Sequence, residues 1–424
     1  MAHTDFMFTA DELRKRRSRL CAAMDARYPD WDTALLIDPV HQYYLTGTMQ
    51  DGIILIRRDG SGGRLFYAVR RSFERALLES PLFGGSSGSG GSGAANETII
   101  PIASYRELAE AAGAELGRAY IEGDTMTAAV WERLTKYFTC TSPEGSRNAA
   151  GFLDRGIRGV RSVKSDAEIE LVRRSGAAHR ILFEEQIPGL LREGMSEADV
   201  LGDISAAMYR LGYQGITRFH QLHAGMALGQ IGFGENALYP SMFDGPGGGM
   251  GACPAAPLSA SSGRRLAKGD AVFVDIGFGV GGYHTDKTQV YFFGASAPPE
   301  LERAQAFCIE LQRRIAALLR PGAIPSQIYR DIMDSLPQAA RAGFMGVDDR
   351  HRVKFLGHGV GLDIDELPVI AHGFNDPLEN NMVLAIEPKK AVTGISLAGV
   401  EDTYIVTPAG GLCVTGGGRG IICV

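Results

Sequence analysis

The chain lacks the features that would place it in a membrane, outside the cell or on a nucleic acid. It contains no run of about 18 apolar residues, so we expect no membrane-spanning helix. Its first residues, MAHTDFMFTADEL, show no basic region followed by an apolar stretch, which argues against a secretory signal. Lysine and arginine form no dense run and the formal net charge is −6, so nucleic-acid binding is not expected.

Cysteine is scarce and scattered along the chain. None of the 6 cysteines shows Cys-x-x-Cys spacing, and we interpret them as reduced, mostly buried thiols of a cytoplasmic protein. Hydrophobic residues make up 45% of the chain and charged residues 22%, proportions that are ordinary for a globular protein. The length of 424 residues leaves room for two or three domains.

The sequence pattern predicts a domain boundary near residue 160. Residues 1–160 alternate strand-like and helical segments, such as WDTALLIDP and SYRELAEAAGAEL, which predicts an α/β domain. Ser165 and Glu168 have the spacing of a capping box, so a long helix is expected to open a second domain, residues 161–424. Strands and helices alternate there and the end reads as mainly antiparallel, which predicts an α+β fold.

Two glycine-rich segments are expected to be loops. Residues 84–94 contain only Gly, Ser and Ala and cannot bury enough apolar surface to order themselves. We expect a flexible loop tip or an introduced linker there, which limited proteolysis would cut first. A second loop, residues 245–270, is rich in Gly and Pro and leads into the strand of Asp275, so we expect it to form a wall of the functional site.

Four carboxylates and one imidazole occur in glycine-punctuated, strand-like segments of the last third of the chain. The segments VFVDIGFGVGGYHTD, KFLGHGVGLDIDELP, VLAIEPK and LAGVEDTYIV contain Asp275, Asp286, His358, Glu387 and Glu401. A lone charge on an apolar run is costly to bury, so a solvated surface explains this set poorly. Such hard ligands can hold two divalent ions if carboxylates bridge them, and a water bound between the ions becomes a nucleophile.

These motifs resemble the pita-bread metallopeptidases of the M24 type, which include methionine aminopeptidase, aminopeptidase P, prolidase and creatinase. The matching text is VDIG, GYHTDKT, GHGVGLDIDE, AIEPK and GVEDT, and the first two ligands, Asp275 and Asp286, are eleven residues apart. The resemblance covers roughly residues 160–424, with a looser creatinase-like match before it. It implies a pita-bread catalytic domain preceded by a smaller creatinase-like domain. It also implies a homodimer, because relatives use such N-terminal domains to cover a partner subunit's active site.

The resemblance also implies a role for each of the five residues. All five would bind metal, with Asp286 and Glu401 as candidate bridges between two ions. Glu387 would be a ligand or the proton acceptor. Manganese, iron(II), cobalt and zinc all suit this set, whereas magnesium prefers to keep more of its waters. The expected reaction is hydrolysis of an amide in a short peptide or small amide, as in Xaa-Pro aminopeptidases and dipeptidases.

The sequence departs from these peptidases where they carry helper groups. The stretch PAAPLSAS has no histidine about seventeen residues before the first Asp, and Asp365 replaces the histidine seven residues after the His ligand. Gly399 and Gln289 stand where arginines are usual. Asp365 can help only if it is protonated or if the substrate is cationic, and we predict it as a second catalytic residue beside Glu387.

Alternatives stay open at this point. A lyase of the sulfoniopropionate type would abstract a proton with a carboxylate, and the pair Asp365–Glu366 loosely resembles the acidic pair of such enzymes. A non-catalytic binding protein and a metal-free, creatinase-like hydrolase are less favoured, because all five ligands are kept. One of four other histidines could replace a missing helper: His220, His223, His284 or His372.

Overall fold

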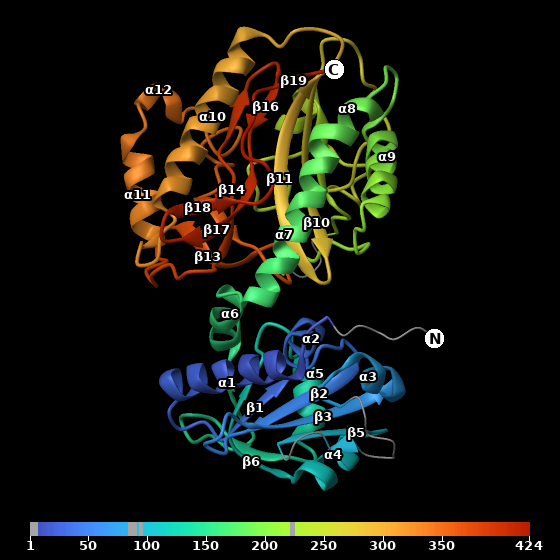
Figure 1. Ribbon diagram of the computed structural model, residues 1–424, viewed down its shortest axis with the longest axis vertical. Helices are drawn as coiled ribbons and strands as arrows, with labels where there is room; N and C mark the ends of the chain where they lie inside the picture. The colour runs from blue at the N-terminus through green and yellow to red at the C-terminus, as the bar shows by residue number, and fades with distance from the viewer. Residues whose placement is uncertain (1–6, 84–90, 93–95, 221–224) are drawn as a thin grey trace. The chain divides into compact units, whose positions relative to one another are not determined.

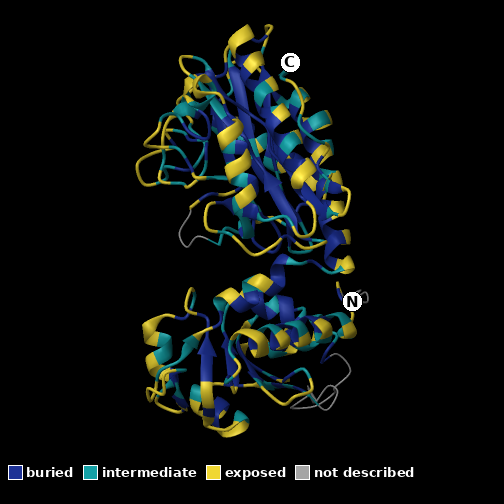
Figure 2. Ribbon diagram, turned by 90° about the vertical axis from the view of Figure 1, so that its left-hand side faces the viewer, coloured by how far each residue is buried: buried dark blue, intermediate teal, exposed yellow. Residues whose placement is uncertain are grey.

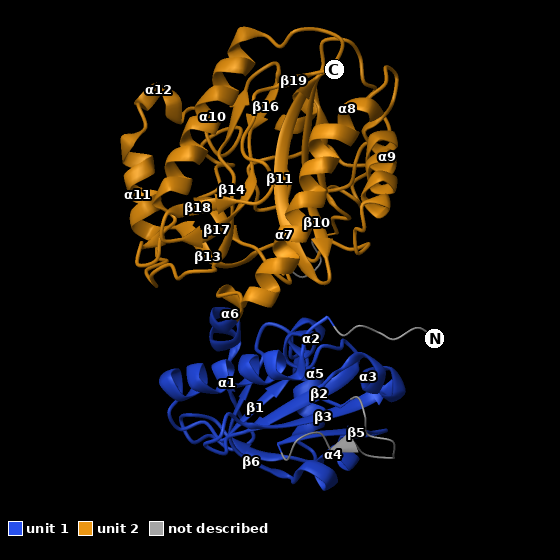
Figure 3. Ribbon diagram, in the orientation of Figure 1, with its two compact units in different colours: residues 1–160 blue, residues 161–424 orange. Residues whose placement is uncertain are grey.

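The structure, a computed structural model, describes residues 7–83, 91–92, 96–220 and 225–424, and its contacts form two compact units, Met1–Val160 and Arg161–Val424 (Figure 3). The Gly/Ser/Ala segment 84–94 lies outside the described residues except for a two-residue strand, Gly91–Ser92. Within the described ranges, no helix is long and apolar enough to cross a membrane. All six cysteines are described and none of them forms a disulfide.

The first unit is built on one mixed sheet with the strand order β4-β5-β3-β2-β1-β6-β7, and β8 pairs with β6. Neighbouring strands are antiparallel at β1–β2 and β2–β3 and parallel at β1–β6 and β3–β5. The strands are β1 (Thr33–Leu36), β2 (Asp51–Arg57), β3 (Arg64–Arg71), β4 (Gly91–Ser92), β5 (Glu97–Pro101), β6 (Glu115–Ile121), β7 (Thr139–Thr141) and β8 (Gly151–Phe152). The helices are α1 (Ala10–Arg27), α2 (Pro39–Thr46), α3 (Phe73–Glu79), α4 (Tyr105–Ala112), α5 (Ala128–Leu134) and α6 (Asp154–Ser162).

The second unit combines helices with short and long strands. Its helical segments are α7 (Asp166–Ile181), a π-helical turn (Leu182–Gln186), α8 (Ile187–Leu190), α9 (Glu197–Arg210), a 3₁₀ turn (Gly234–Leu238), α10 (Pro299–Leu318), α11 (Pro325–Ser335) and α12 (Gln338–Arg341). Its strands are β9 (Gly229–Phe233), β10 (Ala271–Val280), β11 (Tyr283–Phe292), β12 (Phe355–Gly359), β13 (Glu366–Ala371), β14 (Val383–Ile386), β15 (Lys389–Val392), β16 (Ser396–Gly399), β17 (Asp402–Thr407), β18 (Gly410–Cys413) and β19 (Ile422–Cys423).

Three mainly antiparallel sheets organise the second unit. Their strand orders are β19-β11-β10-β9, β13-β12-β14-β17-β18 and β15-β16, and β11–β19 is a parallel pair. Helix α7 runs along β10 and β11, while α10 lies beside β15, β16 and β18 (Figure 1). The long strands are buried beneath these helices (Figure 2). Helices that cover mainly antiparallel sheets confirm the predicted α+β fold.

The predicted capping box begins α7 and connects it to the central sheet. Ser165 Oγ accepts a hydrogen bond from the backbone N–H of Glu168, whose carboxylate accepts one from Ser165 N at 2.8 Å. Glu168 also accepts a hydrogen bond from the Tyr283 hydroxyl at 2.6 Å. One carboxylate therefore satisfies the helix N-terminus and holds it against β11.

A buried ion cluster connects the start of the second unit to the segment that follows β12. Arg161 pairs with Asp363 and Glu366, and Lys164 Nζ lies 3.1 Å from Glu366 Oε2. Burial raises the pKa of Glu366, but the two cations outweigh this effect and bring that pKa down to about 2. Because the folded-state pKa is depressed, the cluster stabilises the protein fully above the ordinary glutamate pKa. The contribution is lost as the pH falls towards 2.

We predict that Glu366→Gln lowers the free energy of unfolding by about 3 kcal/mol at pH 7, because it leaves Arg161 and Lys164 buried without a full counter-charge. Urea titration measures the loss. The control is Glu300→Gln, which removes an exposed partner of Arg303 and should change the free energy by less than about 0.5 kcal/mol. Equal stability of Glu366→Gln and wild type at pH 7 would contradict this role.

Candidate active site

The five predicted ligand residues line one cavity of about 350 Å³ in the second unit. Its walls come from β10, β11 and β12, from the residue after β14 and from the residue before β17. The residues that meet there are Asp275, Asp286, His358, Glu387 and Glu401. They span more than 120 positions of the chain, so only the folded sheets bring them together.

The antiparallel hairpin β10–β11 explains why two of the carboxylates share a face. Asp275 lies directly opposite Thr288, and Asp286 lies opposite Gly277. Because side chains alternate along a strand, positions 275, 277, 286 and 288 all point to the same side of the hairpin. The opposite side carries Val274 and Ile276, which pack into the core.

His358 lies on a strand that neighbours approach closely. A Cβ on Gly357 would lie 2.3 Å from a backbone oxygen of β14, and a Cβ on Gly359 would lie 2.2 Å from the oxygen of Leu367. Glycine is therefore required on both sides of His358 for the strands to meet at this distance. Close packing of the neighbouring strands thus explains the sequence GHG. The same packing fixes the strand from which His358 lines the cavity.

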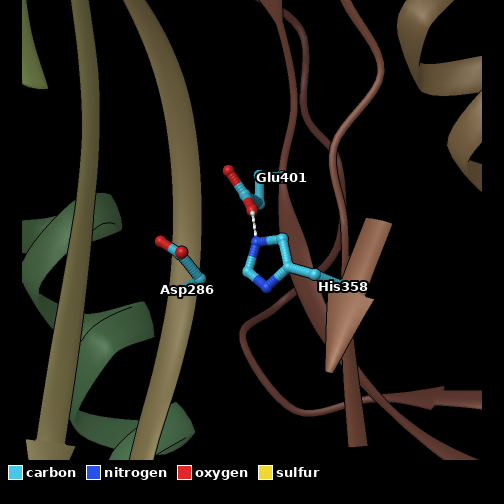
Figure 4. Close-up of side chains that lie close together, drawn as sticks. All are labelled: Asp286, His358 and Glu401. Atoms are coloured by element: carbon cyan, nitrogen blue, oxygen red, sulfur yellow. Dashed lines mark ion pairs between the residues drawn. The ribbon is translucent and has the colours of Figure 1, made fainter. Parts of the chain in front are cut away.

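Three of the five side chains form a group that suits a single divalent ion (Figure 4). One ligand atom each from Asp286, His358 and Glu401 lies within 4.8 Å of the others. His358 Nδ1 is 3.1 Å from the carbonyl oxygen of Gly359, so in the neutral ring the proton sits on Nδ1 and the Nε2 lone pair faces the group. Glu401 Oε1 is buried and accepts no hydrogen bond from any described residue. An imidazole lone pair and an unsatisfied carboxylate oxygen are what an ion needs.

A buried lysine, Lys389, lies against three of these carboxylates. Lys389 Nζ donates to Asp275 Oδ2 at 2.7 Å, to Glu387 Oε2 at 2.9 Å and to Glu401 Oε2 at 2.8 Å. The sequence motifs alone assign no role to Lys389. One local signal could have identified it: Lys389 follows Glu387 by two positions, the spacing that places two side chains on one face of an extended chain.

Burial shifts the pKa values of the carboxylates around this lysine. Burial raises the pKa of Asp275 to about 6 and that of Glu387 to about 7, although Lys389 opposes both shifts. Burial together with Glu401 and Asp275 also raises the pKa of Asp286 well above its ordinary range. Burial is the largest cause of these three shifts, whereas Lys389 and His358 outweigh burial at Glu401 and lower its pKa to about 2.

The other predicted residues occupy different positions. Asp365 lines the cavity, its Oδ1 accepts a hydrogen bond from His220 N at 2.6 Å, and burial raises its pKa. His220 lines the cavity as well. His284 is buried against a backbone carbonyl, His372 is exposed, and His223 lies outside the described residues.

The cavity walls above the carboxylates are aromatic and apolar. Phe219 and Phe243 meet edge to face, with ring centroids 5.9 Å apart, and Met226 and Phe355 extend the same surface. The Gly/Pro-rich loop 245–270, which was expected to form a wall, contributes its first two residues to the lining. A lining that combines aromatic and apolar side chains with a few polar groups is typical of a small-molecule site.

Two protein-family profiles match the chain. Metallopeptidase family M24 matches residues 170–408, and the Creatinase/Prolidase N-terminal domain matches residues 16–146. A probable dipeptidase PepE from Mycobacterium tuberculosis is 32% identical over 262 residues, which are 61% of this chain and 60% of that relative. An uncharacterized peptidase from Staphylococcus aureus is 25% identical over 386 residues, 89% of this chain and 93% of the relative.

Solved structures share the fold over nearly the whole length. Dipeptidase PepE from Mycobacterium ulcerans aligns with a TM-score of 0.72 and 23% identity, covering 98% of this chain and 99% of its own. The Xaa-Pro dipeptidase from Bacillus anthracis aligns with a TM-score of 0.72 and 20% identity, covering 97% of this chain and 100% of its own. At these identities the likeness concerns the fold.

We predict that Mn²⁺ stabilises the wild type and does not stabilise His358→Ala, because the variant loses the imidazole lone pair of the three-residue group. At an ion concentration of about 100 times Kd, the wild type should gain about 2.7 kcal/mol. Urea unfolding with and without Mn²⁺ measures the gain. His372→Ala, which removes an exposed histidine, is the matched control and should keep the full gain. An equal gain in wild type and His358→Ala would exclude His358 as a ligand.

Proposed function

Because the chain belongs to metallopeptidase family M24, we propose that it is a metal-dependent hydrolase that cleaves an amide bond in a short peptide. This membership confirms the resemblance inferred from the five motifs, and the family implies that a divalent metal is bound. The observation that carries the proposal is the convergence of four carboxylates and one imidazole on a single cavity. Relatives named dipeptidase and Xaa-Pro dipeptidase support short peptides as the substrate class.

A divalent ion held by Asp286, His358 and Glu401 would lower the pKa of a bound water and polarise the substrate carbonyl. Glu387 lies next to these three residues, and its Oε1 is 3.4 Å from His358 Nε2. We assign to Glu387 the proton transfer from water to the leaving amine. Lys389 holds the other oxygen of Glu387 and so orients the carboxylate for this transfer.

Manganese, iron(II), cobalt and zinc are the metals that we propose, because all four accept carboxylate oxygen and imidazole nitrogen. The sequence predicts two ions. A second ion beside Asp275 and Glu387 would require Lys389 to leave its three carboxylate partners, so the structure favours one ion.

We propose that the substrate carries a positive charge near the bond that breaks. Asp365 lines the cavity where related peptidases carry a histidine, and an ionised carboxylate would repel a developing oxyanion. The same carboxylate would attract an ammonium group, and the faces of Phe219 and Phe243 suit a cation. The free amino group of a short peptide, or a small cationic amide, meets both conditions.

The lyase alternative is not favoured. Its acidic pair would be Asp365 and Glu366, but Glu366 is held by Arg161 and Lys164 in the buried cluster and does not line the cavity. Its carboxylate is committed to structural ion pairs, which leaves it unsuited to abstract a proton. A non-catalytic binding protein is also disfavoured, because the complete ligand set is retained.

We predict that metal-loaded wild type hydrolyses ordinary Xaa-Pro dipeptides slowly and that Asp365→His accelerates this hydrolysis. A missing oxyanion donor lowers turnover about 100- to 1000-fold, and a neutral imidazole would restore part of that loss. Turnover on several Xaa-Pro dipeptides measures the effect, and Glu387→Gln, which should lose about 100-fold or more, controls for background hydrolysis.

Two outcomes would contradict the proposal. Wild-type turnover of about 10 per second or more without any gain in Asp365→His would show that the missing histidines are unimportant. Cleavage of dimethylsulfoniopropionate with no hydrolysis of any peptide or amide would replace the hydrolase by a lyase.

We also propose a cytoplasmic homodimer, in which residues 1–160 form the creatinase-like N-terminal domain and residues 161–424 carry the catalytic site. The two family matches, at residues 16–146 and 170–408, and the six unpaired thiols support this assignment. Light scattering at micromolar concentration should give twice the mass of one chain, with a salt titration as control against non-specific association. A monomeric mass would contradict the dimer.

A further inference from the structure

The ammonium group of Lys389 is bound as completely as a lysine can be. An ammonium has three N–H donors, and each of them has a carboxylate partner, 2.7 to 2.9 Å away. The lysine side chain is 1% exposed, so water does not compete for these donors. Charge-assisted hydrogen bonds of this kind are about twice as strong as neutral ones, and here three act together.

The backbone provides room for this lysine. Lys389 on β15 lies directly opposite Gly399 on β16. A Cβ at position 399 would lie 2.5 Å from Lys389 Cγ, closer than two carbon atoms can approach. The missing side chain at Gly399 therefore creates the space through which the lysine reaches the carboxylates. Gly399, which stands where the related peptidases usually carry an arginine, is thus explained by the position of Lys389.

Glu401 divides the five predicted ligands into two groups. Its Oε2 accepts hydrogen bonds from Lys389 Nζ and from Thr288 Oγ1, so this oxygen already has two donors. Its Oε1 faces His358 Nε2 at 3.6 Å and accepts no hydrogen bond from the described chain. Oε2 of Glu401 is thus occupied by hydrogen bonds. Oε1 remains available to bind an ion together with Asp286 and His358.

We propose that Lys389 takes the place of a second metal ion, so that this chain binds one divalent ion at Asp286, His358 and Glu401. This inference rests on the proposed metal-dependent function. The lysine and one divalent ion together bring three positive charges to the four predicted ligand carboxylates in the cavity. A second divalent ion would have to share Asp275 and Glu387 with an ammonium already bound to both, and the two cations would repel each other.

Metal stoichiometry tests this proposal directly. Purified protein is titrated with Mn²⁺ by calorimetry and the bound metal is counted by mass spectrometry after gel filtration. Wild type should bind one equivalent. Asp286→Asn should weaken binding on the order of 100-fold or more, whereas Asp275→Asn should keep the single equivalent. Lys389→Gly should gain a second equivalent, and Lys390→Gly, whose ammonium binds two backbone carbonyls instead, should stay at one.

The possible failures can be told apart. Two equivalents in wild type, or loss of an equivalent in Asp275→Asn, would overturn the one-ion site and leave the hydrolase standing. One equivalent without hydrolysis of any peptide would support the one-ion site and overturn the hydrolase. No bound metal would overturn both. If Lys389→Gly does not fold, electron paramagnetic resonance of Mn²⁺-loaded wild type decides, because an isolated ion gives a six-line spectrum and a spin-coupled pair does not.

Discussion

The three ion pairs of Lys389 hold the catalytic cavity together. They connect Asp275 on β10 with Glu387 after β14 and Glu401 before β17, and so join two sheets through one ammonium group. Removing one member of a buried ion pair leaves an uncompensated charge, which is among the most destabilising changes in a protein interior. Lys389 thus acts together with the buried pair Lys287–Asp402 and with the hydrogen bonds between Asp286 and Thr403, which join the same sheets beside the site.

Local sequence patterns were sufficient for the fold class and for the positions of the five predicted ligand residues. The strand-like segments predicted around Asp275 and Asp286 are the paired strands β10 and β11, and the capping box at Ser165 correctly placed the start of α7. The predicted α+β fold and the M24 resemblance are both confirmed. The five ligand positions meet in one cavity, while their binding of metal stays a prediction.

Contacts between distant segments could not be predicted in this way. In the sequence Lys389 is one of two adjacent lysines on a short strand, a pattern typical of an exposed edge, and its burial arises from Asp275, 114 positions away. Asp365 was recognised as a departure, but its contact with the backbone of His220 crosses 145 positions. Glu366 seemed available for catalysis until the structure placed Arg161 and Lys164 against it. Such pairings depend on how sheets and loops pack, which a periodic pattern does not encode.

The cross-strand pair of Lys389 and Gly399 restricts how this sequence could have diverged. Because a Cβ at position 399 would overlap the lysine stem, a lysine at 389 and a side chain at 399 exclude each other. While the lysine remains, single substitutions at 399 are closed to selection. A side chain can therefore enter position 399 only after, or together with, a change at position 389.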